Sequence, residues 1–142
     1  MVSKSDLLLK KSFIFCFGGT FYYFFECLIR GFSHWTMFLL GGLCFSLISV
    51  INQKYSLTMS IIRQMAICSG IITLLEFMTG LLVNVWLKWD VWDYSRVPIN
   101  FMGQISLPFS LLWFFLSLLA IFMDDYIRYL FFGEERVRHR LR

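Results

Sequence analysis

The sequence predicts an all-α polytopic membrane protein with four transmembrane helices, both termini in the cytoplasm and an interfacial segment before the fourth helix. Composition, the spacing of charges and the placement of Lys, Arg and Trp support this fold class. Of the 142 residues, 58% are hydrophobic and only 15% are charged, whereas soluble domains carry about 25% charged residues. The mean hydropathy is +0.69. These values argue against a large soluble enzyme or a nucleotide-binding subunit, and residues 1–142 are expected to form a single transmembrane domain.

Four long intervals with little charge predict the individual spans. A helix needs about 20 mainly apolar residues to cross a hydrocarbon core of about 30 Å. The expected spans cover approximately residues 12–30, 35–52, 64–87 and 104–123. Residues 124–142 are expected to form an amphipathic basic tail whose aromatic residues rest at the membrane surface and whose arginines suit anionic lipid.

Basic residues and tryptophans predict the orientation of these spans, because Lys and Arg are retained in the cytoplasm and Trp prefers the interfaces. Ten basic residues fall beside the termini or between spans two and three: Lys4, Lys10, Lys11, Lys54, Arg63, Arg128, Arg136, Arg138, Arg140 and Arg142. Only Arg30, Lys88 and Arg96 fall on the other side. Trp35, Trp86, Trp89 and Trp92 lie at that other interface. Both termini are therefore predicted to be cytoplasmic.

Small residues suggest how two of the spans pack. Gly42 and Ser46 in the second span, and Ala66 and Gly70 in the third, form two pairs at a spacing of four. Such pairs allow two helix backbones to approach closely. We therefore expect a tight interface between spans two and three.

Ionisable residues within the spans are the candidates for function, because they are costly in lipid and usually face the protein interior or a water-filled cavity. In the first span, polar residues recur at every fourth position: Tyr22, Glu26, Arg30 and His34. This spacing places neighbours on one helix face, and Glu76 of the third span is expected at a similar depth. The five residues predict a substrate or proton site in which Arg30 binds an anion or balances the carboxylates. The alternative is an ion-pair network that fixes helix register.

The segment 88–103 differs from an ordinary connection because tryptophan, tyrosine and charged residues alternate along it. Its polar residues, with the start of the fourth span, predict the outer mouth of the same cavity: Asp93, Tyr94, Asn100 and Gln104. The alternative is an aromatic anchor at the interface with solvated charges.

Motifs of known catalytic sites are absent from the sequence. It contains no H-E-x-x-H, G-x-S-x-G or phosphate-binding loop, so no enzymatic activity and no cofactor are expected. A metal site formed by Glu26, His34 and Glu76 is the weaker alternative, since His34 suits an interfacial position beside Trp35. The net charge of +4 fits membrane lipids as partners, and no RNA-binding or other nucleic-acid-binding pattern is present.

Two long segments resemble a known family. They are G-G-T-F-Y-Y-F-F-E-C-L-I-R-G-F-S-H-W-T-M at 18–37 and V-W-D-Y-S-R-V-P-I-N-F-M-G-Q-I-S-L-P-F-S-L-L-W-F at 91–114. Both are similar to the bacterial membrane proteins described as putative ABC-transporter type IV, the CmpB-like family, and the resemblance covers about residues 18–133. It implies a multi-pass protein of the bacterial cytoplasmic (inner) membrane with a transporter-associated role. The positions that match the family's motifs are Glu26, Arg30, Gly31, Ser33, His34, Trp35, Trp92, Asp93, Tyr94, Asn100, Gly103 and Gln104.

These observations together predict a small permease-like component of a transport system. Because the chain contains no nucleotide-binding motif, an ATPase would have to be a separate subunit. Four helices form a thin wall for a conduit, so a homo- or hetero-oligomer is expected. The alternative function is a non-transporting scaffold or accessory subunit in which the buried charges are structural. A membrane-embedded enzyme is a third, less supported reading.

Overall fold

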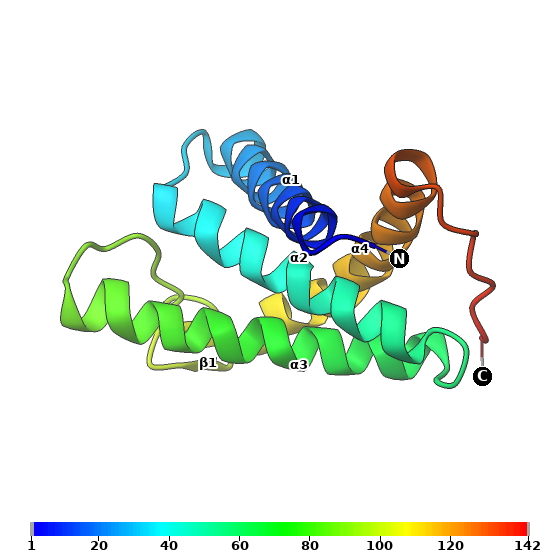
Figure 1. Cartoon of the computed structure of the whole chain (residues 1–142). Coiled ribbons are helices and arrows are strands. Elements are labelled where there is room, and N and C mark those ends of the chain that lie inside the picture. Colours follow the sequence, from blue (N-terminus) through cyan, green and yellow to red (C-terminus); the bar gives the residue numbers. More distant parts are fainter. Residues whose placement is uncertain (1, 142) are drawn as a thin grey trace.

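The computed structural model describes residues 2–141, and its regular secondary structure within them is helical apart from one short hairpin (Figure 1). The elements in order are α1 (Lys4–Arg30), α2 (Trp35–Tyr55), α3 (Ile61–Gly80), the π-helix η1 (Leu81–Trp86), β1 (Asn100–Phe101), β2 (Ile105–Ser106) and α4 (Leu107–Phe132). The π-helix continues α3 without a break. Four of the described helical segments, with α3 and η1 counted as one, are long and apolar enough to cross a membrane. The predicted all-α class with four spanning helices is confirmed.

Local capping explains where the outermost helices begin and end. Ser3 and Asp6 form a capping box at the start of α1, which satisfies amide groups that a helix leaves free. The helix stops at Gly31, whose φ of 81° is readily adopted only by glycine. Ser106 caps the start of α4. The helix ends at Gly133, which adopts a left-handed backbone conformation. Thus α1 begins before residue 12 and α4 extends past residue 123.

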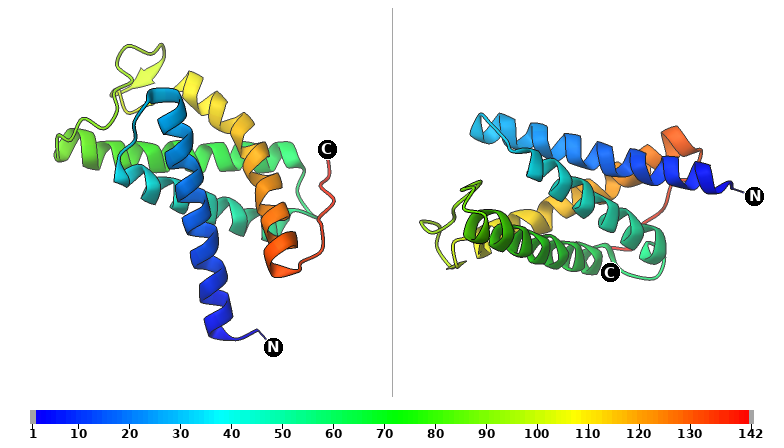
Figure 2. Two further views of the ribbon diagram at one scale, coloured as in Figure 1. Left: turned by 90° about the horizontal axis from the view of Figure 1, so that it is seen from above. Right: turned by 60° about the vertical axis from the view of Figure 1, so that its left-hand side comes forward.

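The four helices form two hairpins that pack against each other at different angles. Helix α1 packs mainly against α2, and α3 packs mainly against α4, while α2 also contacts both α3 and α4. Seen from above, α1 crosses over α3 at a steep angle (Figure 2). The backbones of α1 and α4 make little direct contact. Side chains therefore occupy the space between these two helices, and the candidate site lies there.

Glycines bring the backbones of α1 and α2 together. A Cβ atom on Gly19 would lie 2.5 Å from the carbonyl oxygen of Phe38, and one on Gly42 would lie 2.8 Å from the carbonyl oxygen of Phe15. A Cβ on Gly70 would meet nothing within 4 Å. The expected close interface of spans two and three through Gly42 and Gly70 is therefore wrong, because Gly42 packs against α1 and Gly70 faces outward.

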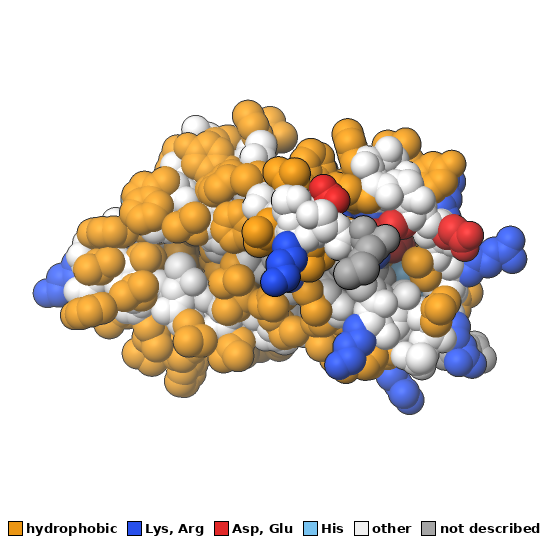
Figure 3. All heavy atoms as spheres, in the orientation of Figure 1, with side chains coloured by type: hydrophobic (Ala, Val, Ile, Leu, Met, Phe, Trp, Pro, Cys, Tyr) orange, Lys and Arg blue, Asp and Glu red, His pale blue; other side chains and the backbone are white. Residues whose placement is uncertain are grey.

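The described parts of both terminal segments lie at one end of the molecule. Lys10 near the start of α1 forms an ion pair with Glu134 just after α4. The Ile61 amide at the start of α3 donates to the carbonyl oxygen of Arg140 at 2.8 Å. Figure 3 shows most of the visible Lys and Arg side chains at this end and apolar side chains over the rest of the visible face. This separation is the charge pattern from which cytoplasmic termini were predicted, and the orientation itself stays a prediction.

Candidate functional site

Glu76 is the most deeply placed carboxyl group of the predicted site. It lies on α3 and is only 2% exposed. Its Oε1 accepts a hydrogen bond from the Tyr94 hydroxyl at 2.7 Å, and its Oε2 accepts one from the Trp113 Nε1 at 3.0 Å. Both donors are neutral, so these contacts orient the carboxyl group without balancing its charge.

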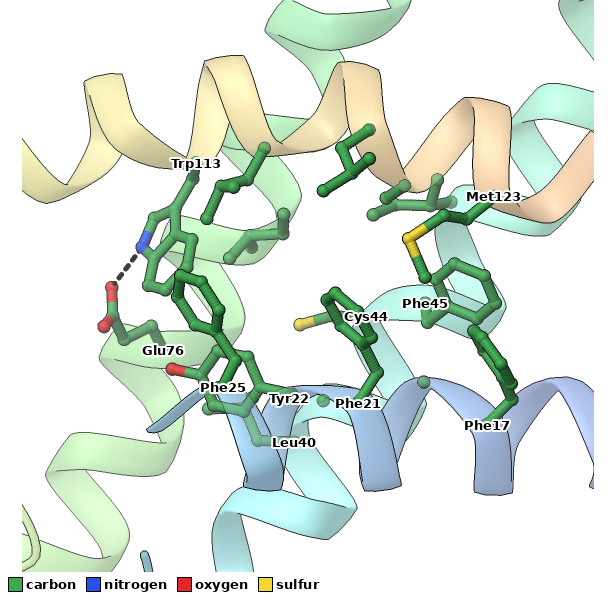
Figure 4. A pocket seen from close by; sticks show the side chains of 17 residues that line it. Phe17, Phe21, Tyr22, Phe25, Leu40, Cys44, Phe45, Glu76, Trp113 and Met123 are labelled. Atoms are coloured by element: carbon green, nitrogen blue, oxygen red, sulfur yellow. Dashed lines mark hydrogen bonds between the residues drawn. The ribbon is translucent and has the colours of Figure 1, made fainter. Parts of the chain in front are cut away.

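A largely apolar cavity extends from Glu76 between the four helices (Figure 4). Helix α1 forms one side of the cavity and α4 the other. Tyr22 of α1 lies in its wall, with its ring centroid 5.8 Å from that of Trp113. Figure 4 shows the Tyr22 hydroxyl directed toward the Glu76 end. The structure thus brings Tyr22, Glu76 and Trp113 together around one cavity.

Glu26 and Arg30 form a separate polar cluster near the end of α1. The Arg30 Nη1 donates to Glu26 Oε1 at 2.9 Å, and the Ser33 hydroxyl donates to Glu26 Oε2 at 2.6 Å. The Arg30 Nη2 donates to the carbonyl oxygen of Val91 at 2.8 Å. These contacts lie within the α1–α2 hairpin or connect it to the loop that follows η1. The cluster therefore stabilises the packing of the hairpin against this loop.

The two clusters are adjacent but do not merge. Within residues 2–141, neither Glu26 nor Arg30 donates to or accepts from Glu76. They are connected through the loop, because Val91 contacts Arg30 and Tyr94 contacts Glu76. Within the described residues, Arg30 therefore pairs with Glu26 and not with Glu76, so it does not balance both carboxylates by direct contact.

Tyr94 is the link between the loop that follows η1 and the cavity. Its ring stacks on that of Phe109 with a centroid separation of 4.5 Å. Burial is the main cause that raises the pKa of the Tyr94 hydroxyl above its usual value, and the neighbouring Glu76 carboxylate is the second cause. The hydroxyl is therefore protonated at neutral pH and acts as a donor to Glu76.

The other residues of the predicted outer mouth shape the loop itself. Asp93 is exposed and accepts from the Ser95 amide and hydroxyl, both at 2.8 Å, and these bonds hold the pKa of Asp93 below its usual value. The Asn100 side-chain amide donates to the carbonyl oxygens of Ser95 and Val97. Gln104 is buried and holds the loop from the other side, since its backbone carbonyl accepts from the Trp92 Nε1 at 3.0 Å.

His34 lies apart from both carboxylates. It caps α2, accepting from the Thr36 amide at 3.3 Å. Its ring lies 5.5 Å from that of Trp35 and 5.7 Å from that of Trp89, measured between centroids. In the described part of the chain, no three His, Cys, Asp or Glu residues are grouped so that they could hold a metal ion. The alternative metal site of Glu26, His34 and Glu76 thus lacks its geometry.

Asn84 is a site residue that the sequence reasoning missed. It lies in the π-helix η1, and its Oδ1 accepts from the Val91 amide at 2.7 Å while its Nδ2 donates to Gln104 Oε1 at 2.8 Å. One side chain thereby fixes both ends of the loop that carries Tyr94. A π-helical segment often marks a functional position, but the sequence carries no clear signal for it.

Replacing Asn84 with alanine is expected to loosen this loop. The Val91 amide would lose its only described side-chain partner, at a cost of about 1 kcal/mol or more, which corresponds to roughly fivefold faster amide exchange. Hydrogen exchange followed by mass spectrometry over residues 88–96 measures the effect. Asp93→Ala is the control, because Asp93 bonds only within its own turn. Equal exchange at Val91 in both variants would contradict the role of Asn84.

A second buried polar cluster, also missed, lies at the opposite end of the bundle. Asp124 of α4 is 0% exposed and Asn52 of α2 is 1% exposed. The Asn52 Nδ2 donates to Asp124 Oδ2 at 3.0 Å and to Asp125 Oδ1 at 2.6 Å. His139 of the C-terminal segment contacts Asp125, and Arg128 lies near Asp124. Asp124 is therefore a core residue of α4 and does not belong to a surface tail.

Comparison with known proteins gives one finding. A family model described as putative ABC-transporter type IV matches residues 9–135. The matched region includes α1 from residue 9 onward, all of α2, α3 and α4, and both the Glu26 and the Glu76 clusters. No curated protein and no solved structure shows a significant match to the chain.

Proposed function

Since this chain belongs to the putative ABC-transporter type IV family, we propose that it is a small permease-like component of a transport system. The proposed site is centred on Glu76, with Tyr22, Tyr94 and Trp113 around it. The observation that carries the proposal is a carboxyl group that is 2% exposed, whose described hydrogen-bond donors are both neutral, and that lies at the end of a cavity between four apolar helices. Ionisable groups in this position commonly mark substrate or ion pathways. The proposal assigns no chemical reaction to the chain.

The second candidate function is that of a membrane scaffold or accessory subunit. The Glu26–Arg30 pair favours it, because its described contacts are all internal and involve Ser33 and the backbone of Val91. Such a pair fixes how the α1–α2 hairpin meets the loop that follows η1. Glu26 and Arg30 thus support the structural reading, whereas Glu76 supports the transport reading.

A transport component of this kind needs partners in the membrane. An ATPase is expected as a separate subunit, and a homo- or hetero-oligomer is expected because four helices enclose only a small cavity. Membrane lipids would contact the exposed apolar side chains of the four helices. We place the chain in the bacterial cytoplasmic membrane with both termini inside, following the distribution of Lys and Arg.

Affinity purification from native membranes in a mild detergent tests this function. We expect an ATP-binding subunit to co-purify with the tagged chain, together with vanadate-sensitive ATP hydrolysis. The Glu76→Gln variant should retain the partner and lose at least half of any substrate-stimulated hydrolysis. Stable recovery of an unrelated membrane complex without an ATPase would favour the scaffold function, and a strictly monomeric chain in lipid nanodiscs would count against transport.

A further inference from the structure

The cavity next to Glu76 has a side opening between α1 and α4. Phe21 of α1 and Leu119 of α4 both line the cavity, and they are 43% and 47% exposed. Both lie within helices that are apolar enough to span a membrane, so this opening faces the acyl chains of the bilayer. A ligand could therefore reach Glu76 from within the membrane.

The shape of the cavity suits an elongated apolar group. It runs from Glu76 and Trp113 at one end to Phe17 and Met123 at the other (Figure 4). Ten residues of α4 separate Trp113 from Met123, which is roughly 15 Å of helix and about half of a 30 Å hydrocarbon core. The enclosed volume is about 100 Å³, less than an apolar cavity of about 150 Å³ that holds benzene. A longer chain would thus be partly enclosed and partly exposed to lipid.

The end of the cavity at Glu76 suits a cation. Within residues 2–141, no Lys, Arg or His forms a salt bridge with Glu76, because Arg30 is engaged by Glu26. The rings of Tyr22 and Trp113 border the same end. Aromatic rings attract ammonium groups through their quadrupoles, and a buried carboxylate whose described partners are neutral donors is stabilised by an opposite charge.

We propose that this cavity binds an amphipathic amine or quaternary ammonium compound with one apolar tail. The ammonium group lies beside Glu76 against the contacting rings of Tyr22 and Trp113, and the tail follows the apolar wall toward Met123. The ligand enters from the bilayer between α1 and α4. The identification of this compound as a transported substrate rests on the proposed function, whereas its binding does not.

Photo-crosslinking tests the proposal with a dodecyltrimethylammonium probe that carries a diazirine in its chain. The full chain is placed in phosphatidylglycerol nanodiscs, illuminated and digested, and the labelled residues are identified by mass spectrometry. We expect labels on Phe21, Leu116 and Met123, and labelling about tenfold stronger than that with the corresponding neutral alcohol. Equal labelling by the ammonium and alcohol probes would overturn the assignment of a cation site.

Two carboxylate variants locate the charge that is responsible. Glu76→Gln is expected to reduce labelling by the ammonium probe about tenfold while leaving labelling by the alcohol unchanged. The unchanged alcohol signal shows that the cavity is still folded. Glu26→Gln should leave both signals unchanged, because Glu26 contacts Arg30 and Ser33 and does not line the cavity. An equal loss of ammonium labelling in both carboxylate variants would overturn the assignment to Glu76.

The source of the amine is distinguished by the lipid. If replacing half of the phosphatidylglycerol with phosphatidylethanolamine reduces ammonium labelling of the wild-type chain by a larger factor than that of Glu76→Gln, the site accepts a lipid amine with one of its two tails in the cavity. If both fall by the same factor, which reflects only the lower surface charge of the bilayer, the site prefers a free single-tailed amine. Both outcomes require the cation site. Binding is independent of transport here, so labelling without an ATPase partner would overturn the permease role alone. An ATPase partner without labelling at the cavity would overturn the ligand assignment alone.

Discussion

Replacing Gly19 with alanine is expected to destabilise the protein, whereas the same replacement at Gly70 is expected to stabilise it. Alanine is favoured over glycine in a helix interior by about 1 kcal/mol at either position. At Gly19 the new Cβ would lie 2.5 Å from the Phe38 carbonyl oxygen and 2.9 Å from the Phe38 ring. The carbonyl oxygen belongs to the backbone of α2, so it cannot move without distorting that helix. Relieving this overlap costs about 3 kcal/mol, the upper part of the range for overpacking, so the overlap outweighs the gain in helix propensity.

The free energy of unfolding of both variants is measured by titrating sodium dodecyl sulfate into the protein in a mild detergent while circular dichroism monitors the loss of helix. Gly19→Ala should lower the free energy of unfolding by about 2 kcal/mol, and Gly70→Ala should raise it by up to about 1 kcal/mol. Gly70 is the matched control because a Cβ there would meet nothing within 4 Å. If both replacements change the stability in the same direction, the close approach of α1 and α2 is not what determines the requirement for glycine.

The different fates of these glycines show which parts of the fold the sequence could predict. The length of an apolar segment and its lack of charged residues indicate that it crosses the membrane as a helix. Every span must match the same hydrocarbon thickness and keep charge out of it. These two properties do not specify which helices pack together. The position of Gly42 in the sequence is compatible with contact to either α1 or α3. Only the tertiary structure, in which Gly42 packs against Phe15 of α1, distinguishes the two. The helix count was therefore predictable, whereas the helix pairing was not.

The candidate site was predictable to a similar degree. An ionisable residue in an apolar span is visible in the sequence, and Glu26 and Glu76 were found in this way. Their partners were not, since Trp113 and Asn84 are ordinary residues of a membrane helix until the tertiary structure places Trp113 beside Glu76 and Asn84 beside Val91. The sequence identified the groups that are costly to bury, but the neutral donors that hold them depend on long-range contacts.

Asp124 is a case in which a usable signal was present. The predicted span ends at residue 123 because charged residues follow it. The buried residues of α4 are Trp113, Ser117, Ile121, Asp124 and Ile127. Their spacing of three and four is that of one helix face, and it continues through Asp124. Extending the helical period past the first charge would have placed this carboxyl group in the core.

Replacing Asn52 with leucine is expected to have the largest effect on stability at this end of the bundle. Asn52 donates to Asp124 and Asp125 from a position that is 1% exposed. Leucine fills a similar volume but leaves both carboxyl groups without this donor. Hydrogen bonds to charged groups contribute about 1.5–3 kcal/mol each, so Asn52→Leu should lower the free energy of unfolding by about 3 kcal/mol. Gln53→Leu is the control, because Gln53 is exposed and, within residues 2–141, its side chain donates to Ser49 and to neither carboxyl group.

A double-mutant cycle separates the loss of the hydrogen bond from the loss of asparagine itself. Asp124→Leu removes the buried acceptor, and it should also destabilise the chain because Arg128 and Asn52 then lose a partner. In the double variant Asn52→Leu/Asp124→Leu, two apolar side chains face each other, and replacing both members of a buried polar pair is far less costly than removing one. The two single effects should therefore exceed the double effect by about 1–3 kcal/mol in the same unfolding experiment. Strict additivity would mean that Asn52 and Asp124 do not stabilise each other, and that the cluster does not hold α4 against α2.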